Sequence, residues 1–258
     1  MIEGWYPIIM AALFGAVVGS FLNVAIHRLP RGESIVLPSS HCPSCSAPIA
    51  SYDNIPIISY LFLRGRCRSC NARISLRYPI VEAANAFLWA LVVQRFGIGA
   101  EGLVWAAYSS ALIVVTGIDL DHRLIPDAIT LPGMALGLAA SLFMPITFLD
   151  SLAALFLGGG FFYAVAVISD FLLGKPGMGG GDIKLTAMIG AFLGVKNMAF
   201  AVLAALCSGS IVAIILIVLG IKTRKDVIPF GPYLALGGIT ALFWGEPVIE
   251  WYLKLSSF

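Results

Sequence analysis

The sequence predicts an all-α polytopic membrane protein with about eight transmembrane helices and a small zinc-ribbon-like loop domain. Three observations indicate this class. Of the 258 residues, 59% are hydrophobic and only 12% are charged, whereas soluble domains carry about 25% charged residues. The apolar residues fall in long runs, and one of the polar breaks between them contains four cysteines. This composition, with a net charge of +2, argues against a soluble enzyme, a disordered tail and a nucleic-acid binder.

Eight apolar runs are candidates for membrane helices, since a span needs about 20 mostly apolar residues. They cover residues 5–27, 80–96, 102–118, 128–145, 150–172, 183–195, 198–221 and 230–250. The first run has no basic residue before Arg28 and is longer than a signal-peptide core, so we expect a retained helix. We therefore expect a first transmembrane helix over 1–27, a cytoplasmic double-CxxC loop domain over 28–79, and a membrane core with seven further helices over 80–258.

The basic residues predict the orientation of these helices. Starting outside, the outside segments hold only Arg95, Lys196 and Lys254. The inside segments hold Arg28, Arg31, Arg64, Arg66, Arg68, Arg73, Arg77, Arg123, Lys175, Lys184, Lys222, Arg224 and Lys225. Because cytoplasmic loops are enriched in Lys and Arg, we expect both termini outside and the loops 28–79, 119–127 and 174–182 in the cytoplasm.

Several glycines recur four residues apart within the apolar runs. This spacing lets membrane helices pack closely, so it predicts packing positions and no function. The pairs are Gly15/Gly19, Gly133/Gly137 and Gly190/Gly194.

Four cysteines form two CxxC pairs separated by 21 residues: Cys42, Cys45, Cys67 and Cys70. This spacing is typical of a tetrahedral four-thiolate zinc site, and a cytoplasmic loop disfavours disulfides. Redox-active or unliganded pairs are the alternative. Four protein ligands leave zinc no open position, so we expect a structural Zn²⁺ that contributes folding free energy. His41 is a possible substitute ligand, and Cys207, within an apolar run, is expected to be a buried packing residue.

Two aspartates lie at the inside ends of apolar runs. Asp119 directly follows the run ending at Ile118, and Asp182 closes the glycine-rich segment 177–181. Ionisable residues at membrane depth are costly and indicate function, although each could simply mark where a helix leaves the bilayer. The span after Asp182 covers about 20 Å, less than a ~30 Å hydrocarbon core, so we expect Asp182 below the headgroups. Its glycines leave room for another backbone.

These motifs together resemble those of bacterial type IV prepilin peptidases, in order along the whole chain. The resemblance is carried by Ile118-Asp119-x5-Ile125-Pro126-Asp127 and by Gly179-Gly180-Gly181-Asp182-Ile183-Lys184-Leu185. It extends to the double CxxC loop, to Gly19–Pro30 (GSFLNVAIHRLP) and to Arg77–Glu82 (RYPIVE).

The resemblance implies a bifunctional enzyme of the bacterial inner membrane with its active site on the cytoplasmic side. Such enzymes remove the short basic leader of prepilins and pseudopilins, then N-methylate the new N-terminal residue with S-adenosylmethionine. It implies that Asp119 and Asp182 are the two catalytic aspartates of the peptidase step. Two adjacent carboxyls can hold one proton between them, as acid–base hydrolysis of a peptide requires.

Some assignments stay open. Asp121 or Asp127 could replace Asp119, which we favour because it alone directly follows an apolar run. The resemblance implies that the loop 28–79 and its flanks carry methyl transfer. The polar residues that flank this loop, for which we expect helix capping rather than cofactor binding, are Asn23, His27, Arg28 and Glu82.

Two other functions remain as alternatives. A peptidase without methyl transfer would retain the same motifs. A proton-coupled transporter would use Asp119 and Asp182 as proton carriers, but the two halves of the chain lack the repeated broken helices typical of transporters. The sequence predicts membrane lipid and prepilin substrates as partners. It does not indicate which pilin is the substrate, nor the oligomeric state.

Overall fold

The computed structural model describes residues 4–174, 178–223, 226 and 228–256, and it is mainly helical outside the loop between Arg28 and Arg77. Within these ranges no strand forms, and pairing is limited to the isolated bridges His41–Pro48 and Arg66–Arg73. The prediction of an all-α protein is confirmed. Four residues used above lie outside the described residues: Lys175, Gly177, Arg224 and Lys225.

The chain divides into two compact units, Met1–Val114 and Val115–Phe258. Helix α4 (Ala100–His122) begins in the first unit and ends in the second. Each unit is described by itself.

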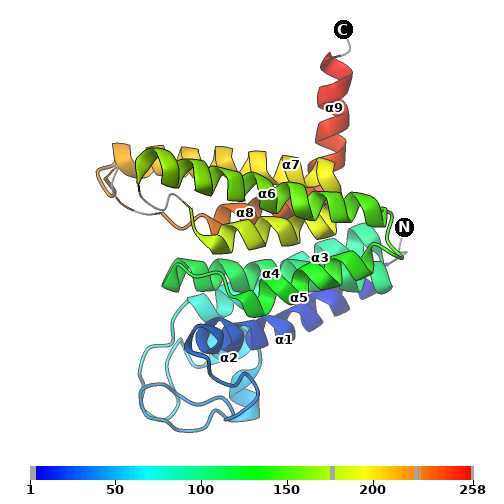
Figure 1. Cartoon of the computed structure of the whole chain (residues 1–258). Helices are drawn as coiled ribbons and strands as arrows, with labels where there is room; N and C mark the ends of the chain where they lie inside the picture. The colour runs from blue at the N-terminus through cyan, green and yellow to red at the C-terminus, as the bar shows by residue number, and fades with distance from the viewer. Residues whose placement is uncertain (1–3, 175–177, 224–225, 227, 257–258) are drawn as a thin grey trace. The chain divides into compact units, whose positions relative to one another are not determined.

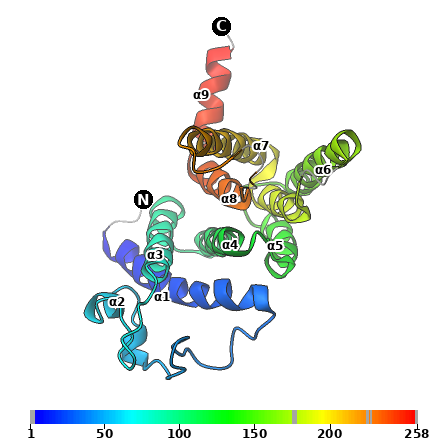
Figure 2. The ribbon, with the colours of Figure 1, turned by 90° about the vertical axis from the view of Figure 1, so that its left-hand side faces the viewer.

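The first unit combines long helices with a loop domain that holds the cysteines. Helices α1 (Tyr6–Arg28) and α3 (Arg77–Phe96) pack against each other (Figure 2). They approach closely because Gly15 and Gly19 lie at the crossing, where a Cβ atom would meet Trp89 Cβ at 2.8 Å and Glu82 Cα at 2.7 Å. The loop between them contains the short helices η1 (Leu29–Arg31), η2 (Ser51–Asn54) and α2 (Ile58–Phe62).

A buried polar network joins the three long helices of this unit. The Asn85 side chain, with no exposed surface, donates to the Gly15 carbonyl at 2.7 Å and accepts from the Ser110 hydroxyl at 2.8 Å. Ser110 in turn accepts from the Trp89 indole N–H at 3.0 Å. Interhelical hydrogen bonds of this kind each contribute on the order of 1 kcal/mol in membranes.

The second unit is built around α7 (Gly180–Val218), which packs against α5 (Asp127–Ala140), α6 (Phe148–Leu173) and α8 (Gly231–Thr240) (Figure 1). The chain ends with the π-helical turn η3 (Ala241–Gly245) and α9 (Glu246–Ser256). The glycine spacing again marks close contacts, since a Cβ on Gly137 would meet Ala191 at 3.0 Å and one on Gly190 would meet the Ala154 carbonyl oxygen at 2.5 Å. The prediction that the paired glycines serve packing is confirmed for all except Gly194.

Helix α7 is broken at Gly194, which has a left-handed φ of 73°. Only glycine adopts this conformation at low cost. The carboxylate of Asp150 lies against Gly194 and accepts from the Val195 N–H at 3.3 Å, so it caps the segment that follows. The range of α7 therefore contains two helices, one before and one after Gly194, and they correspond to the two predicted runs 183–195 and 198–221.

Four helices of the described residues are long and apolar enough to cross a membrane: Tyr6–Arg31, Ala100–His122, Phe148–Leu172 and Gly180–Val218. The chain is thus an integral membrane protein. The count of about eight spans is not confirmed, although each predicted run overlaps a helix. Of the remaining runs, α3 carries charged residues, α5 has 14 residues, and the last run is divided among α8, η3 and α9.

Candidate functional site

Asp119 lies near the end of α4 and is 5% exposed. Its Oδ2 atom accepts from the backbone N–H of Gly231, the first residue of α8, at 2.9 Å. Helix α4 ends just beyond it because Arg123 takes a left-handed φ of 52° and donates its N–H to the Asp119 carbonyl at 2.9 Å. The carboxylate is therefore buried and held by a backbone donor distant in sequence.

Asp182 lies in the first turn of α7 and is partly buried. Its own N–H donates to the Gly179 carbonyl at 3.1 Å, which starts the helix. Asp182 lies close enough to Asp119 for the two carboxylate charges to interact. The second unit thus brings together the two aspartates that the sequence singles out.

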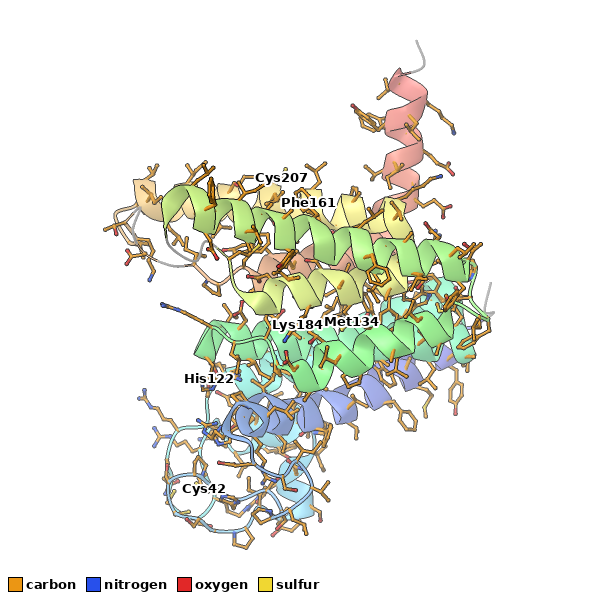
Figure 3. The ribbon with its side chains drawn as sticks, in the orientation of Figure 1. Cys42, His122, Met134, Phe161, Lys184 and Cys207 are labelled. Carbon is orange, nitrogen blue, oxygen red and sulfur yellow. The ribbon has the colours of Figure 1, made fainter. Side chains whose placement is uncertain are left out.

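Two further contacts hold the aspartate segments together. A Cβ atom on Gly181 would lie 2.8 Å from Ile125 Cβ, so only glycine allows this approach. Lys184, labelled in Figure 3, donates to both carboxylate oxygens of Asp127 at 2.7 Å. The space that Gly181 leaves beside Asp182 is thus occupied by the Ile125 side chain.

The alternative aspartates have different surroundings. Asp121 and Asp127 are exposed, and Asp127 is paired with Lys184, whereas Asp119 is buried. Burial and proximity to Asp182 therefore favour Asp119 as a member of the carboxylate pair.

The four cysteines of the loop domain form a cluster. The sulfur atoms of Cys42, Cys45, Cys67 and Cys70 all lie within 4.8 Å of one another, and those of Cys42 and Cys70 are 3.8 Å apart. Four thiol donors at this separation match the ligand set of a closed, tetrahedral zinc site. The cluster includes no histidine, and His41 instead contacts the Ser39 carbonyl at 3.1 Å.

The two cysteine pairs have the same backbone geometry. Cys42 donates its N–H to the Ala47 carbonyl at 2.9 Å, and Cys67 donates to the Ala72 carbonyl at 2.8 Å. The residue after each second cysteine, Ser46 or Asn71, has a left-handed φ of 56°. The Cys45 and Ser44 amides bond the Cys42 sulfur and lower its pKa to about 6, which favours the metal-binding thiolate.

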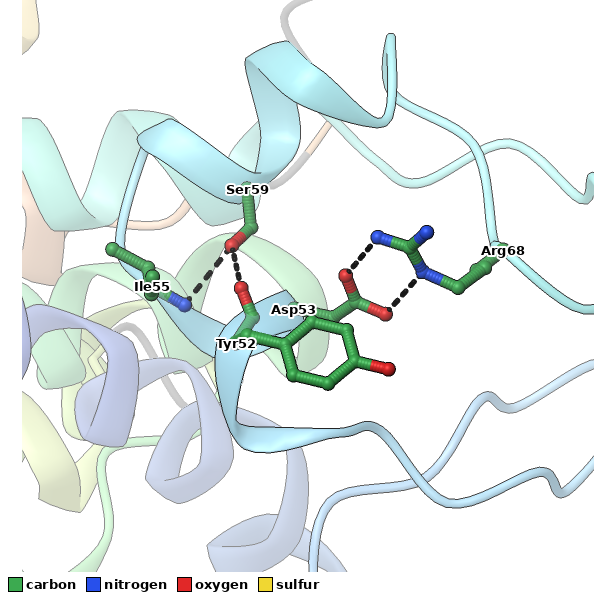
Figure 4. A network of polar contacts seen from close by, with 5 residues as sticks. All are labelled: Tyr52, Asp53, Ile55, Ser59 and Arg68. Atoms are coloured by element: carbon green, nitrogen blue, oxygen red, sulfur yellow. Dashed lines mark hydrogen bonds and ion pairs between the residues drawn. The ribbon is translucent and has the colours of Figure 1, made fainter.

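A polar network connects the second cysteine pair with the segment between the pairs (Figure 4). The Arg68 guanidinium donates to both carboxylate oxygens of Asp53, at 2.7 and 2.6 Å, and lies 5.5 Å from the centre of the Tyr52 ring. Ser59 donates to the Tyr52 carbonyl at 2.9 Å and accepts from the Ile55 N–H at 3.0 Å. These bonds brace the loop domain independently of the sulfur atoms.

The fifth cysteine corrects a prediction. Cys207 (Figure 3) is exposed on α7, not buried. In a membrane helix, apolar side chains can face either lipid or the rest of the protein. An apolar sequence alone therefore does not show which side of the helix packs against other helices.

A cavity of about 600 Å³ lies between the loop domain and the adjoining ends of α1 and α3. All four polar residues that flank the loop line it. Asn23 donates to the Gly19 and Tyr78 carbonyls at 3.3 and 3.1 Å, and Arg28 to the Ser34 and Pro38 carbonyls at 2.9 and 2.8 Å. Asn23 and Arg28 therefore bond backbone carbonyls, whereas the His27 ring contacts the Arg31 side chain at 3.0 Å; none of these bonds is a helix cap. Glu82 differs, since it accepts from the Ile57 N–H at 2.7 Å and from the Ser20 hydroxyl.

Three residues of these sites were not found from the sequence: Gly231, Asp53 and Arg68. The Gly231-Pro232 dipeptide is a recognisable helix start, because glycine and proline punctuate helices. No local pattern indicates that this start contacts Asp119, 112 residues away. The Asp53–Arg68 pair likewise joins residues 15 positions apart, with the short helix α2 between them.

Comparison with known proteins agrees with this architecture. The bacterial peptidase A24 N-terminal domain model matches residues 13–96, and the type IV leader peptidase family model matches residues 106–214. The prepilin leader peptidase/N-methyltransferase of Pseudomonas aeruginosa is 38% identical, over 97% of this chain and 95% of that protein. Proteins of the same name from Aeromonas hydrophila and Legionella pneumophila are 37% and 36% identical, over 96% of this chain and 94% and 95% of theirs. No solved structure matches.

The fold and the cysteine cluster define an all-α integral membrane protein with a candidate metal-binding loop domain. The two family models and the similarity along nearly the whole chain identify it further. The chain belongs to the type IV leader peptidase family.

Proposed function

We propose that this protein cleaves the leader peptide from prepilins or pseudopilins at the cytoplasmic face of the inner membrane, and then N-methylates the new N-terminus with S-adenosylmethionine. The observation that carries the peptidase step is the close placement of Asp119 and Asp182 in the second unit. The names of the full-length relatives support both steps.

Asp119 and Asp182 would act together on the scissile peptide bond. The ionised carboxylate takes a proton from a water molecule, whose oxygen attacks the carbonyl carbon. The protonated carboxyl donates a hydrogen bond to the carbonyl oxygen, and a proton reaches the leaving amine as the C–N bond breaks. The Gly231 N–H holds the Asp119 carboxylate in one orientation during these transfers.

The cysteine cluster would hold a structural Zn²⁺, with Cys42, Cys45, Cys67 and Cys70 as ligands. The donors fit, because four thiolates supply a complete tetrahedral set and keep no position for substrate. Bound zinc would stabilise the loop domain, in which helices are short and much of the chain is irregular.

Methyl transfer is assigned to the first unit, where the loop 28–79 meets α1 and α3. S-adenosylmethionine supplies an electrophilic methyl group when it is bound. The protein must hold the donor and orient the acceptor amine, and the cavity beside Glu82 offers a partly open volume for this purpose.

The decisive assay uses the full chain purified in detergent, a prepilin and labelled S-adenosylmethionine, with cleavage and methylation followed in one reaction. We expect Asp119→Asn and Asp182→Asn each to lower the cleavage rate by about 100- to 10,000-fold while the protein still folds. Full cleavage by either variant would exclude the aspartate pair. If the wild type cleaves the prepilin but does not methylate it, only the peptidase activity is supported.

A further inference from the structure

We propose that the cavity of the first unit is the S-adenosylmethionine site, and that the Glu82 carboxylate binds the cationic end of this ligand. The inference rests on the proposed methyl transfer and assigns it a location and a charged residue.

The cavity has the size and lining of a cofactor site. Its volume is about 600 Å³, within the range of roughly 300–1,000 Å³ that small-molecule pockets occupy. Aromatic rings of Tyr52, Tyr60 and Tyr78 line it together with many polar side chains, which include arginines as well as carboxylates. Aromatic rings beside polar groups of both charges suit a ligand that carries a purine and a zwitterionic amino-acid end.

Glu82 is the unusual member of the lining. It is 7% exposed, and its two hydrogen-bond donors are the Ile57 N–H and the Ser20 hydroxyl. Neither donor carries a charge, so the two bonds do not neutralise the carboxylate. A buried charge without a counter-charge is costly, and a cationic ligand would offset this cost.

The two other carboxylates that line the cavity do not have this property. Asp53 forms a bidentate ion pair with Arg68, and Glu33 is exposed to solvent. Asp53 is therefore already neutralised, and water screens Glu33. Glu82 is the carboxylate of this lining that a cationic ligand would stabilise most.

The backbone at Glu82's donor is strained. Ile57 has a φ of 61°, which is costly for a β-branched residue, and its N–H is the group that donates to Glu82 at 2.7 Å. The hydrogen bond therefore fixes both the turn before α2 and the direction of the carboxylate. Strained residues held in this way concentrate at binding sites.

The methionine end of S-adenosylmethionine carries two positive groups, a sulfonium and an ammonium, and one carboxylate, so this end is positively charged overall. S-adenosylhomocysteine keeps the ammonium but has a neutral thioether in place of the sulfonium. The two ligands therefore distinguish which cation faces Glu82.

The test is equilibrium dialysis of both ligands with the purified full chain, comparing the wild type with Glu82→Gln and Glu33→Gln. Glutamine keeps an acceptor for the Ile57 N–H and removes only the charge. We expect Glu82→Gln to weaken S-adenosylmethionine binding by at least about tenfold, and Glu33→Gln to change it by less than about twofold. If Glu82→Gln loses affinity only for S-adenosylmethionine, the sulfonium is the group that faces Glu82. If it loses affinity equally for both ligands, the ammonium is that group.

Unchanged affinity in Glu82→Gln would overturn the role of Glu82, provided that zinc content and melting temperature match the wild type. A second variant tests the cavity itself. Ala50 lines the wall, so Ala50→Trp should occupy part of the volume and weaken binding, and unchanged binding would overturn the site. If the wild type methylates prepilin and Glu82→Gln binds S-adenosylmethionine normally, this inference is wrong and the proposed function stands. If the wild type neither binds S-adenosylmethionine nor methylates prepilin, the proposed function itself is wrong.

Discussion

The backbone N–H of Gly231 donates to Oδ2 of Asp119 at 2.9 Å, and a Cβ atom on Gly231 would lie only 2.7 Å from that same oxygen. The start of α8 therefore holds the carboxylate, and only glycine fits there. Gly231→Ala should displace the Asp119 carboxylate without unfolding the protein, because the displaced atoms belong to a side-chain end. Misplacement by about 1 Å can lower a rate on the order of a hundredfold.

The measurement for this first prediction is the leader-cleavage rate at saturating prepilin. Gly160→Ala is the matched control, because a Cβ atom there meets nothing within 4 Å. Equal rates for Gly231→Ala and Gly160→Ala would show that the position of Asp119 does not depend on this contact.

The Lys184–Asp127 pair should have a positioning role of modest size. The two side chains are 39% and 56% exposed, so their interaction contributes at most about 1 kcal/mol. Asp127→Asn and Lys184→Gln should each lower the cleavage rate by less than about fivefold, and the double variant should be no worse than either single variant. If Asp127→Asn abolished cleavage while Asp119→Asn retained it, Asp127 would be the catalytic partner of Asp182 instead of Asp119.

Zinc should depend on the cysteine cluster alone. The wild type should contain about one zinc ion per chain, and Cys42→Ser/Cys67→Ser should contain almost none, because each pair loses a ligand. Metal analysis measures the content, and limited proteolysis within residues 40–75 should become faster as the loop domain loses its structure. Cys207→Ser serves as the control, since Cys207 is not a member of the cluster. Equal, near-zero zinc in all three proteins would argue against a metal.

The Asp53–Arg68 pair predicts a pH dependence of stability. The hydrogen bond and charge of Arg68 hold the pKa of Asp53 below its ordinary value of 3.8. A carboxyl with a lowered folded-state pKa stabilises the protein above its unfolded-state pKa, and this stabilisation is lost as pH falls through the folded-state value. The wild type should therefore have a higher melting temperature than Asp53→Asn at neutral pH. The difference between the two melting temperatures should shrink as the pH falls below about 3.8. A difference that stays constant down to pH 3 would contradict the pair.

The parts of the molecule that depend on local sequence could be predicted from it. Each apolar run overlaps a helix, and the paired glycines except Gly194 lie at helix crossings, because periodicity and residue size act locally. The clustering of the four sulfurs also followed from spacing, since each CxxC pair forms its own turn.

The relations between distant segments could not be predicted. The contact of Gly231 with Asp119 and the carboxylate of Glu82 in a cavity both require the packed arrangement of helices. The same limitation explains Cys207, because its apolar neighbours do not reveal which face of α7 is covered. The number of membrane spans is also undetermined by hydropathy when helices are short or kinked.

The break at Gly194 has a consequence for the lipid. The part of α7 before it, residues 180–193, is about 21 Å long at 1.5 Å per residue, against a hydrocarbon thickness of about 30 Å. A membrane segment that is too short is accommodated by local thinning of the bilayer. Thinner hydrocarbon around this half of α7 would bring bulk water nearer to Asp182. Hydrolysis consumes one water per cleavage, so the shortness of this segment would ease the supply of that water to the aspartate pair.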